Sequence, residues 1–250
     1  MKKFLTALLV TILLGCEQEV ISSSKNSPGE EQMIVAAHEG DSVSAVYTAA
    51  IVPEKMTVQE KKKRFRYLIV PAAKKVFNEL ERQHQRIENS IKAGTEGLLI
   101  KQLKVEYKAD SDQDLLERLK PHPVSVVLAQ AAMESAWATS RFFVKAKNIF
   151  GVWSFDKNEP RIAAEQKRGD KTIWLKKYKS IEDAIHDNYR VLARGHAFSK
   201  FRQMRIKSDN PFELVKGLDK YSELGSKYGK ELAAVIKYNK FNHYDSDHRI

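Results

Sequence analysis

The chain has 250 residues, 42% of them hydrophobic, and is long enough for one or two domains with a sizeable core. Lys and Arg number 43 against 32 Asp and Glu, a formal net charge of +11, and there is a single cysteine. One cysteine excludes an intramolecular disulfide and a cysteine-based zinc site, and no stretch after the N-terminus reaches the roughly 20 apolar residues that span a bilayer. The composition therefore indicates a basic globular protein.

The chain begins with MKKFLTALLVTILLGC, which has the layout of an export signal. Lys2 and Lys3 precede an apolar run at 4–14 that is too short to cross a membrane permanently. The end of this segment, LLGC, resembles a bacterial lipobox, which implies removal of residues 1–15 and acylation of Cys16. The alternative is an ordinary signal peptide in which Cys16 is incidental, but the position of the only cysteine favours the lipobox.

The polar stretch that follows carries Ser, Pro and Gly and has no sustained hydrophobic period. We therefore expect residues 16–52 to form a flexible tether that separates the folded part from a lipid surface. Glu17, rather than Asp, follows the cysteine, which favours the outer membrane, facing the periplasm, if the host is Gram-negative. The prediction is an envelope protein that is anchored to a membrane through Cys16.

Helical periodicity starts at Thr57 and predicts a helical N-terminal region over 53–120. Thr57 and Glu60 have the spacing of a capping box, and Pro71 is expected to break or kink the first helix. An apolar stripe with three- and four-residue steps resumes after the proline. The basic run KKKRFR at 61–66 is typical of a solvated helix face, with contact to anionic lipid or wall polymer as the alternative.

A carboxylate stands on the apolar face of the next predicted helix, within the segment PHPVSVVLAQAAMESAWATS at 121–140. Glu134 follows Ala131 by three residues and Val127 by seven, so it shares their inward face. A buried carboxylate is unfavourable unless it is paired, protonated or catalytic, and burial raises its pKa toward the range of a general acid at neutral pH. Position alone makes Glu134 either a member of a buried ion pair or a general acid.

The residues around this glutamate resemble a known family. The segments AQAAMESAW at 129–137, SRF at 140–142 and NIFG at 148–151 are similar to the core motif of glycoside hydrolase family 73, the glucosaminidases of the lysozyme superfamily that cut bacterial peptidoglycan. The likeness is closer to the Bax-type branch and runs from about Pro53 to Asn242. The chain departs at Ala136 and Ala138, where the family commonly has glycine, and this change is expected to narrow the floor of the cleft.

The resemblance implies a mainly α fold: a lysozyme-like helical domain with a small β-hairpin lobe over 121–250, preceded by the N-terminal helical segment. The hairpin is expected where the period changes, with strands at 161–166 and 171–178 and a tight turn at Gly169. Ser180 then begins a helix, and more helical segments follow toward the C-terminus.

The resemblance also implies an endo-β-N-acetylglucosaminidase in which Glu134 protonates the glycosidic oxygen. A glycosidase usually needs a second group, and the family's carboxylate on the β-lobe points to Glu165. Glu159, Asp156 and Asp170 are nearby alternatives, and assistance by the sugar's own N-acetyl group is another route.

Aromatic and polar residues are expected around the cleft by the same resemblance. Lys220-Tyr221-Ser222 resembles the family's C-terminal tyrosine motif, and Tyr221 is the first choice for a catalytic phenol opposite the acid. Trp137 is expected in the core. The residues expected to bind substrate are Ser135, Asn148, Phe150, Gly151, Trp153 and Tyr228, with loop turning as the alternative role of Asn148 and core packing as that of Tyr228.

The histidines are scattered without ligand spacing, so no metal or cofactor is predicted. The expected partners are peptidoglycan glycan strands and, through the lipid anchor, a membrane. Nucleic acid is not expected for an exported chain, and the protein is expected to be a monomer. Two other functions stay open: a lytic transglycosylase, which releases an anhydro sugar without water, and a catalytically inactive wall-binding lipoprotein.

Overall fold

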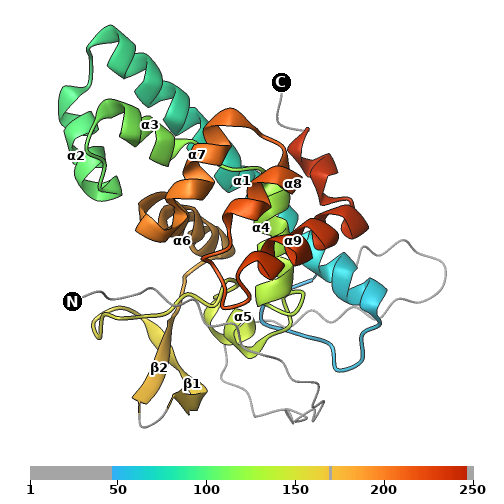
Figure 1. Cartoon of the computed structure of the whole chain (residues 1–250). Coiled ribbons are helices and arrows are strands. Elements are labelled where there is room, and N and C mark those ends of the chain that lie inside the picture. Colours follow the sequence, from blue (N-terminus) through green and yellow to red (C-terminus); the bar gives the residue numbers. More distant parts are fainter. Residues whose placement is uncertain (1–46, 169–170, 247–250) are drawn as a thin grey trace.

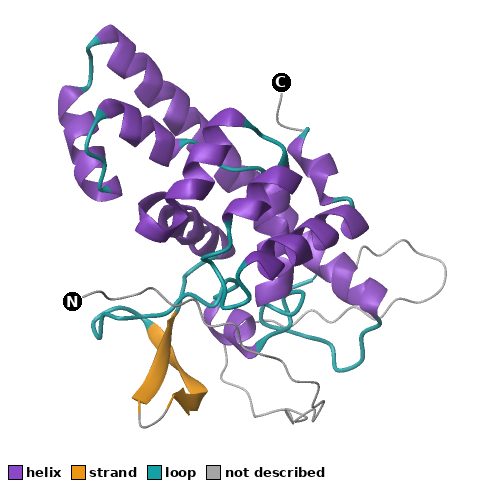
Figure 2. Cartoon of the chain, in the orientation of Figure 1, coloured by secondary structure: helices purple, strands orange, loops and turns teal. Residues whose placement is uncertain are grey.

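A computed structural model of the chain describes residues 47–168 and 171–246. The described part is mainly helical, with one two-stranded antiparallel sheet at its lower edge (Figures 1 and 2), so the predicted fold class is confirmed. The predicted signal segment, Cys16, most of the tether and Gly169 lie outside the described residues. Within the described ranges, no helix has the length and apolar character needed to span a bilayer.

The first helix, α1, spans Val58–Ala93 and begins with the predicted capping box. The backbone N–H of Glu60 donates to Thr57 Oγ1 at 3.2 Å, and the backbone N–H of Thr57 donates to Glu60 Oε2 at 2.7 Å. The prediction of a break at Pro71 is wrong, because the helix continues through it. Pro71 lies on the exposed side while its neighbours on either side, Val70 and Ala72, are buried, so packing against the core offsets the hydrogen bond that the proline removes.

Helix α1 runs across the molecule and crosses α4 (Figure 1), so its two halves contribute to different apolar clusters. Helices α2 (Gly97–Tyr107) and α3 (Asp112–Leu119) fold back against its C-terminal half. Its N-terminal half instead joins the main core. The smaller cluster contains Ile87, Ile100, Leu103, Tyr107, Leu115, Leu119 and Ala193.

The main core surrounds α4, which spans Val124–Glu134. Its first nine residues are all buried, so the helix is enclosed on every side and not only on the face that periodicity picked out. Helices α1, α6 (Ile181–Arg194) and α9 (Ser226–Asn239) enclose it together with the 3-10 turn η3 (Phe241–Asp245). The remaining helical elements are α5 (Arg141–Ala146), η1 (His196–Phe198), α7 (Ser199–Lys207), α8 (Pro211–Leu214) and η2 (Val215–Gly217).

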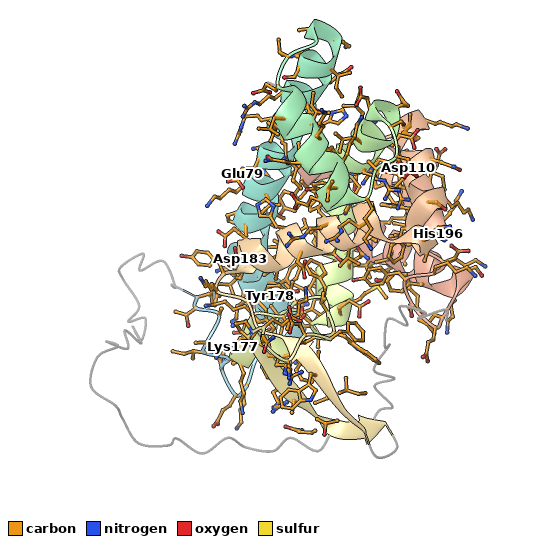
Figure 3. The ribbon with its side chains drawn as sticks, turned by 90° about the vertical axis from the view of Figure 1, so that its left-hand side faces the viewer. Glu79, Asp110, Lys177, Tyr178, Asp183 and His196 are labelled. Atoms are coloured by element: carbon orange, nitrogen blue, oxygen red, sulfur yellow. The ribbon has the colours of Figure 1, made fainter. Side chains whose placement is uncertain are left out.

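The predicted hairpin consists of β1 (Arg161–Arg168) and β2 (Lys171–Lys176). Arg161 pairs with Lys176 and Ala163 with Trp174, and an irregularity in the register follows Ala163. Figure 3 labels Tyr178 where the chain passes from the hairpin to the helical body. There the Tyr178 hydroxyl donates to Asp187 Oδ2 of α6 at 2.7 Å, which ties the lobe to the helices.

Close packing of α9 against η2 requires a glycine. A Cβ atom added to Gly229 would lie 2.5 Å from the carbonyl oxygen of Val215, which is too close for any real contact. We therefore expect Gly229→Ala to lower the free energy of unfolding by about 1–3 kcal/mol in urea denaturation. Gly97→Ala is the matched control, since a Cβ there meets nothing within 4 Å; equal effects of the two variants would contradict this account.

Candidate active site

Glu134 is the last residue of α4, and its side chain is partly exposed. The Tyr228 hydroxyl of α9 donates to Glu134 Oε1 at 2.9 Å. The sequence left two roles for Glu134, a buried ion pair and a general acid. In the described part of the chain no Lys or Arg forms an ion pair with Glu134, so the first of these is not found. Burial raises the pKa of Glu134 to about 7, although the hydrogen bond from Tyr228 acts in the opposite direction. Near neutral pH this carboxyl can therefore both hold and donate a proton.

The chain turns sharply just after this carboxyl. Ala136, Trp137 and Ala138 have φ values of 50°, 63° and 61°, so three successive residues that are not glycine are left-handed. Such residues cost about 1–2 kcal/mol each. From the sequence, Ala136 and Ala138 were expected to narrow the floor of the cleft. What the structure shows is that both alanines have a backbone conformation that glycine adopts more easily.

Ser135 lies inside this turn and is fully buried. Its hydroxyl donates to the carbonyl oxygen of Ala131 at 2.5 Å and accepts from the backbone N–H of Ala138 at 2.8 Å. Trp137 is partly buried and packs against the core, as expected, with its ring edge-on to that of Phe65 and the ring centroids 5.3 Å apart. The contacts of Ser135 thus support the turn, and substrate binding by this residue stays a prediction.

Four buried side chains form a directional hydrogen-bond chain that ends at the acid. Tyr221 donates to Asn188 Oδ1 at 3.2 Å, and Asn188 Nδ2 donates to Gln130 Oε1 at 3.4 Å. Gln130 Nε2 then donates to the Tyr228 hydroxyl at 3.4 Å, which itself donates to Glu134. Because each donor points toward Glu134, the chain directs the Tyr228 proton to the carboxyl oxygen.

The two tyrosines stack with ring centroids 5.3 Å apart and an interplanar angle of 9°. Tyr228 is the one that contacts Glu134, whereas Tyr221, the first choice from sequence, stands at the far end of the hydrogen-bond chain. The sequence analysis missed Gln130 and Asn188. Gln130 precedes Glu134 by four residues, so it is a polar residue on the same face of a buried helix, and this was the available signal.

The loop between α5 and the hairpin is braced by Asn148, which is buried. Its Nδ2 donates to the carbonyl oxygens of Val152 and Lys176, and its Oδ1 accepts from the backbone N–H of Val152, all at 2.9 Å. Every one of these contacts is to backbone, as the loop-turning alternative expects. Gly151 has φ 66°, which a side chain would strain, and Phe150 is buried in the core.

This loop presents Trp153, which is partly exposed and pairs with the edge of β2 at Leu175. The Phe155 ring lies 6.0 Å from that of Trp153 and its residue is 72% exposed. Of the residues predicted to bind substrate, Trp153 is therefore the one with an open aromatic surface of the kind that stacks on sugars. Phe155 was not singled out by sequence.

Glu165 lies on β1 with a side chain that is 76% exposed. Its Oε1 forms an ion pair with Arg141 Nε of α5 at 2.9 Å, and Arg141 Nη1 donates to the carbonyl oxygen of Ala163 at 3.2 Å. These contacts link the hairpin to the helix that follows the left-handed turn. The structure shows no hydrogen bond between Glu165 and Glu134, and the role of Glu165 stays a prediction.

Of the alternative carboxylates, Asp156 accepts from the backbone N–H of Asn158 at 2.8 Å, and Glu159 lies 3.7 Å from Lys176 Nζ. Asp170 lies outside the described residues. Across 47–168 and 171–246, no three His, Cys, Asp or Glu side chains gather in a way that could hold a metal ion.

The helical body thus presents, beside a small hairpin, a carboxyl with a raised pKa at the end of a buried helix, which is the kind of group that serves as the acid in a glycoside hydrolase. Residues 109–241 match the family model Glucosaminidase, described as mannosyl-glycoprotein endo-beta-N-acetylglucosaminidase. The chain therefore belongs to the glucosaminidase family, glycoside hydrolase family 73, which confirms the resemblance seen in its motifs. It is an enzyme of the endo-β-N-acetylglucosaminidase type.

Solved structures similar to this chain include the catalytic domain of the autolysin Auto from Listeria monocytogenes, with 16% identity, coverage of 77% of this chain and 92% of that one, and a TM-score of 0.49. A peptidoglycan hydrolase from Sphingomonas sp. A1 has 18% identity, coverage of 53% and 84%, and a TM-score of 0.40. A glycoside hydrolase domain of FlgJ from Salmonella typhimurium has 19% identity, coverage of 55% and 93%, and a TM-score of 0.38. A search of curated proteins finds no match.

Proposed function

We propose that this protein is a peptidoglycan hydrolase that cleaves the glycan strand of the bacterial cell wall after N-acetylglucosamine, with Glu134 as the general acid. The observation that carries the proposal is the carboxyl of Glu134, held by Tyr228 and with a pKa raised to about 7 by burial. Family membership supplies the bond type. Removal of residues 1–15 takes away Lys2 and Lys3, so the formal net charge of +11 becomes +9, which suits an anionic wall polymer because it speeds encounter more than it adds specificity.

In this mechanism the protonated Glu134 donates to the glycosidic oxygen while the bond from that oxygen to the anomeric carbon breaks. Tyr228 donates to Oε1, which leaves Oε2 as the oxygen that carries the transferred proton. A water molecule attacks the anomeric carbon and loses its proton to a base. Trp153 provides a stacking surface for a sugar ring.

For the base we propose Glu165 on the hairpin, whose carboxylate forms an ion pair with Arg141. The alternative is assistance by the substrate's N-acetyl group, with no second carboxylate. Glu165→Gln distinguishes the two: a large loss of kcat supports Glu165, and retention of kcat supports the N-acetyl route. Tyr221, Ser135, Asn148, Phe150 and Gly151 support the site in this proposal through the contacts described above.

We further propose the envelope placement that the N-terminal sequence predicts. Residues 1–15 act as a lipoprotein signal, Cys16 carries the lipid, and residues 16–52 act as a tether for a monomeric enzyme that works on the periplasmic side of the outer membrane in a Gram-negative host. The N-terminal helical region, 53–120, and the catalytic region, 121–250, follow. Palmitate labelling of intact cells tests the anchor, since Cys16→Ala must abolish the label.

Mass spectrometry of the products released from purified peptidoglycan tests the reaction itself. We expect muropeptides with a reducing-end N-acetylglucosamine, because water completes the cleavage. Products that end in anhydro-muramic acid would instead identify a lytic transglycosylase. Binding to the wall without any released product, in wild type and Glu134→Gln alike, would identify a wall-binding lipoprotein.

The tyrosine nearest the acid gives a separate prediction. We expect Tyr228→Phe to lower kcat by about tenfold or more, because the carboxyl of Glu134 loses the hydrogen bond that holds it. We also expect the alkaline limb of the pH–rate profile to move to higher pH, because the lost hydrogen bond no longer lowers the pKa of Glu134. Tyr221→Phe is the matched comparison, since its hydroxyl contacts Asn188 and not Glu134. A larger loss in Tyr221→Phe would instead support Tyr221 as the catalytic phenol, as the sequence analysis expected.

A further inference from the structure

Arg64 is a fully buried cation on α1, outside the segment that matches the family model. Its Nη1 donates to the carbonyl oxygen of Ala138 at 2.6 Å. Its Nη2 donates to the carbonyl oxygens of Thr48 at 2.7 Å and Ile51 at 3.1 Å, with a longer contact of 3.3 Å to that of Ala49. Among the described residues no carboxylate pairs with Arg64, so its two Nη atoms donate to backbone carbonyls alone, and its buried Nε has no hydrogen-bond partner there.

A buried guanidinium without a carboxylate is unfavourable, because removing its hydration is only partly offset by hydrogen bonds to neutral groups. Burial accordingly lowers the pKa of Arg64. Hydrogen bonds from a charged donor are nevertheless about twice as strong as those between neutral groups. Arg64 therefore provides a strong anchor, and the structure places it on the last residue of the left-handed turn that follows Glu134.

The left-handed turn at 136–138 begins two residues after Glu134. The three left-handed residues reverse the chain directly after α4, and the turn is closed by Trp137 N–H donating to the carbonyl oxygen of Ala132 at 2.9 Å. Alanine, unlike glycine, adopts this conformation only when its surroundings impose it. The anchor on Ala138 comes from 74 residues earlier in the chain.

We propose that Arg64 is a positioning residue that holds the left-handed turn at 136–138 and thereby fixes the carboxyl of Glu134 in its reactive orientation. The N-terminal helix thus completes the catalytic site of a domain whose family match begins only at residue 109. Because Glu134 is the proposed acid, this inference rests on the proposed function. The inference states specifically that Ala136 and Ala138 need Arg64 to keep the left-handed turn, whereas glycines at these two positions would not.

The test is a double-mutant cycle on the full chain. Arg64→Met is combined with the pair Ala136→Gly and Ala138→Gly, and kcat and KM are measured on solubilised peptidoglycan for the wild type, each change alone and the combination. Far-ultraviolet circular dichroism and the melting temperature report on folding. Arg82→Met is the matched control, since Arg82 is exposed on the same helix and makes no hydrogen bond or ion pair within the described ranges.

We expect Arg64→Met to lower kcat by about 10- to 100-fold with KM changed less than about threefold, because a small displacement of the acid is enough for such a loss. Adding the two glycines is expected to recover at least about tenfold of that loss, since glycine adopts the turn without support. Arg82→Met is expected to keep kcat within about twofold.

A loss of kcat in Arg64→Met that the glycines do not reverse would overturn the proposal, and so would full activity of Arg64→Met. If Arg64→Met does not fold, the same rule applies to Arg64→Lys, which keeps the charge but not the forked donor geometry. Glu134→Gln separates failure of the proposed function from failure of the Arg64 proposal. If Glu134 is not the acid, Glu134→Gln retains activity, whatever the Arg64 variants do.

Discussion

Replacing Glu134 with glutamine is expected to lower kcat on peptidoglycan by about 10²- to 10⁴-fold, the range that a general acid contributes. Glutamine keeps the shape of the side chain and an oxygen that can accept from Tyr228, so the loss reports on the proton and not on packing. Product release measured by chromatography of muropeptides is the readout. Glu54→Gln is a suitable control, because Glu54 is exposed and far in sequence from the site; a similar loss there, or activity in Glu134→Gln, would contradict the assignment.

The same variant is expected to be more stable than the wild type at pH 8. The pKa of Glu134 is raised from 4.5 to about 7 in the folded state, so the stability that its protonated form contributes is fully present below pH 4.5 and is lost as the pH rises through 7. Glutamine cannot ionise and avoids this loss, which we place at about 1–3 kcal/mol. Urea unfolding should show the gap between the two proteins at pH 8 and its closure at pH 4.5.

The second large effect is the pH dependence of the wild-type rate. Since the acid must be protonated to act and its pKa in the free enzyme is about 7, kcat/KM is expected to fall by about tenfold for each pH unit well above that value, or about 50-fold between pH 7 and pH 9. Initial rates on a soluble glycan measure this directly. A profile that is flat up to pH 9 would mean that Glu134 does not supply the proton in the rate-limiting step.

A control is needed, because the substrate and other groups also titrate over this range. Circular dichroism at pH 7 and at pH 9 separates a loss of the acid proton from unfolding. Tyr228→Phe then provides an internal check, because the removal of its hydrogen bond should shift the alkaline limb upward. A limb that stays in place in that variant would assign the titration to another group.

Much of the helical framework could be predicted, because its signals are local. The capping box of Thr57 and Glu60, the helix start at Ser180 and the hairpin at 161–176 all appear where the spacing indicated. Pro71 shows the limit of such signals. A proline disfavours a helix through its own backbone, but whether the helix ends there depends on what its neighbours bury, and here they are held in the core.

The candidate site was predictable in part. Glu134 was identified from its place on an apolar helix face, and burial does raise its pKa as that reasoning required. The order of the tyrosines was not predictable, because Tyr221 and Tyr228 are both buried and aromatic, and only the packing of α9 against α4 brings the Tyr228 hydroxyl to the acid. Gln130 shares the helix face of Glu134, but this spacing alone does not identify the side chains that its amide contacts.

By itself, the sequence determined the family and the mainly helical class, and it identified Glu134 as the candidate acid, since motifs and periodicity are properties of neighbouring residues. The tertiary structure alone decided which groups contact that acid and its turn. Tyr228 is 94 residues from Glu134, and Arg64 is 74 residues from Ala138. Periodicity shows which face of a helix is buried, but hydrogen-bond partners at such separations depend on how the helices cross, and that is set by the packing of the whole core.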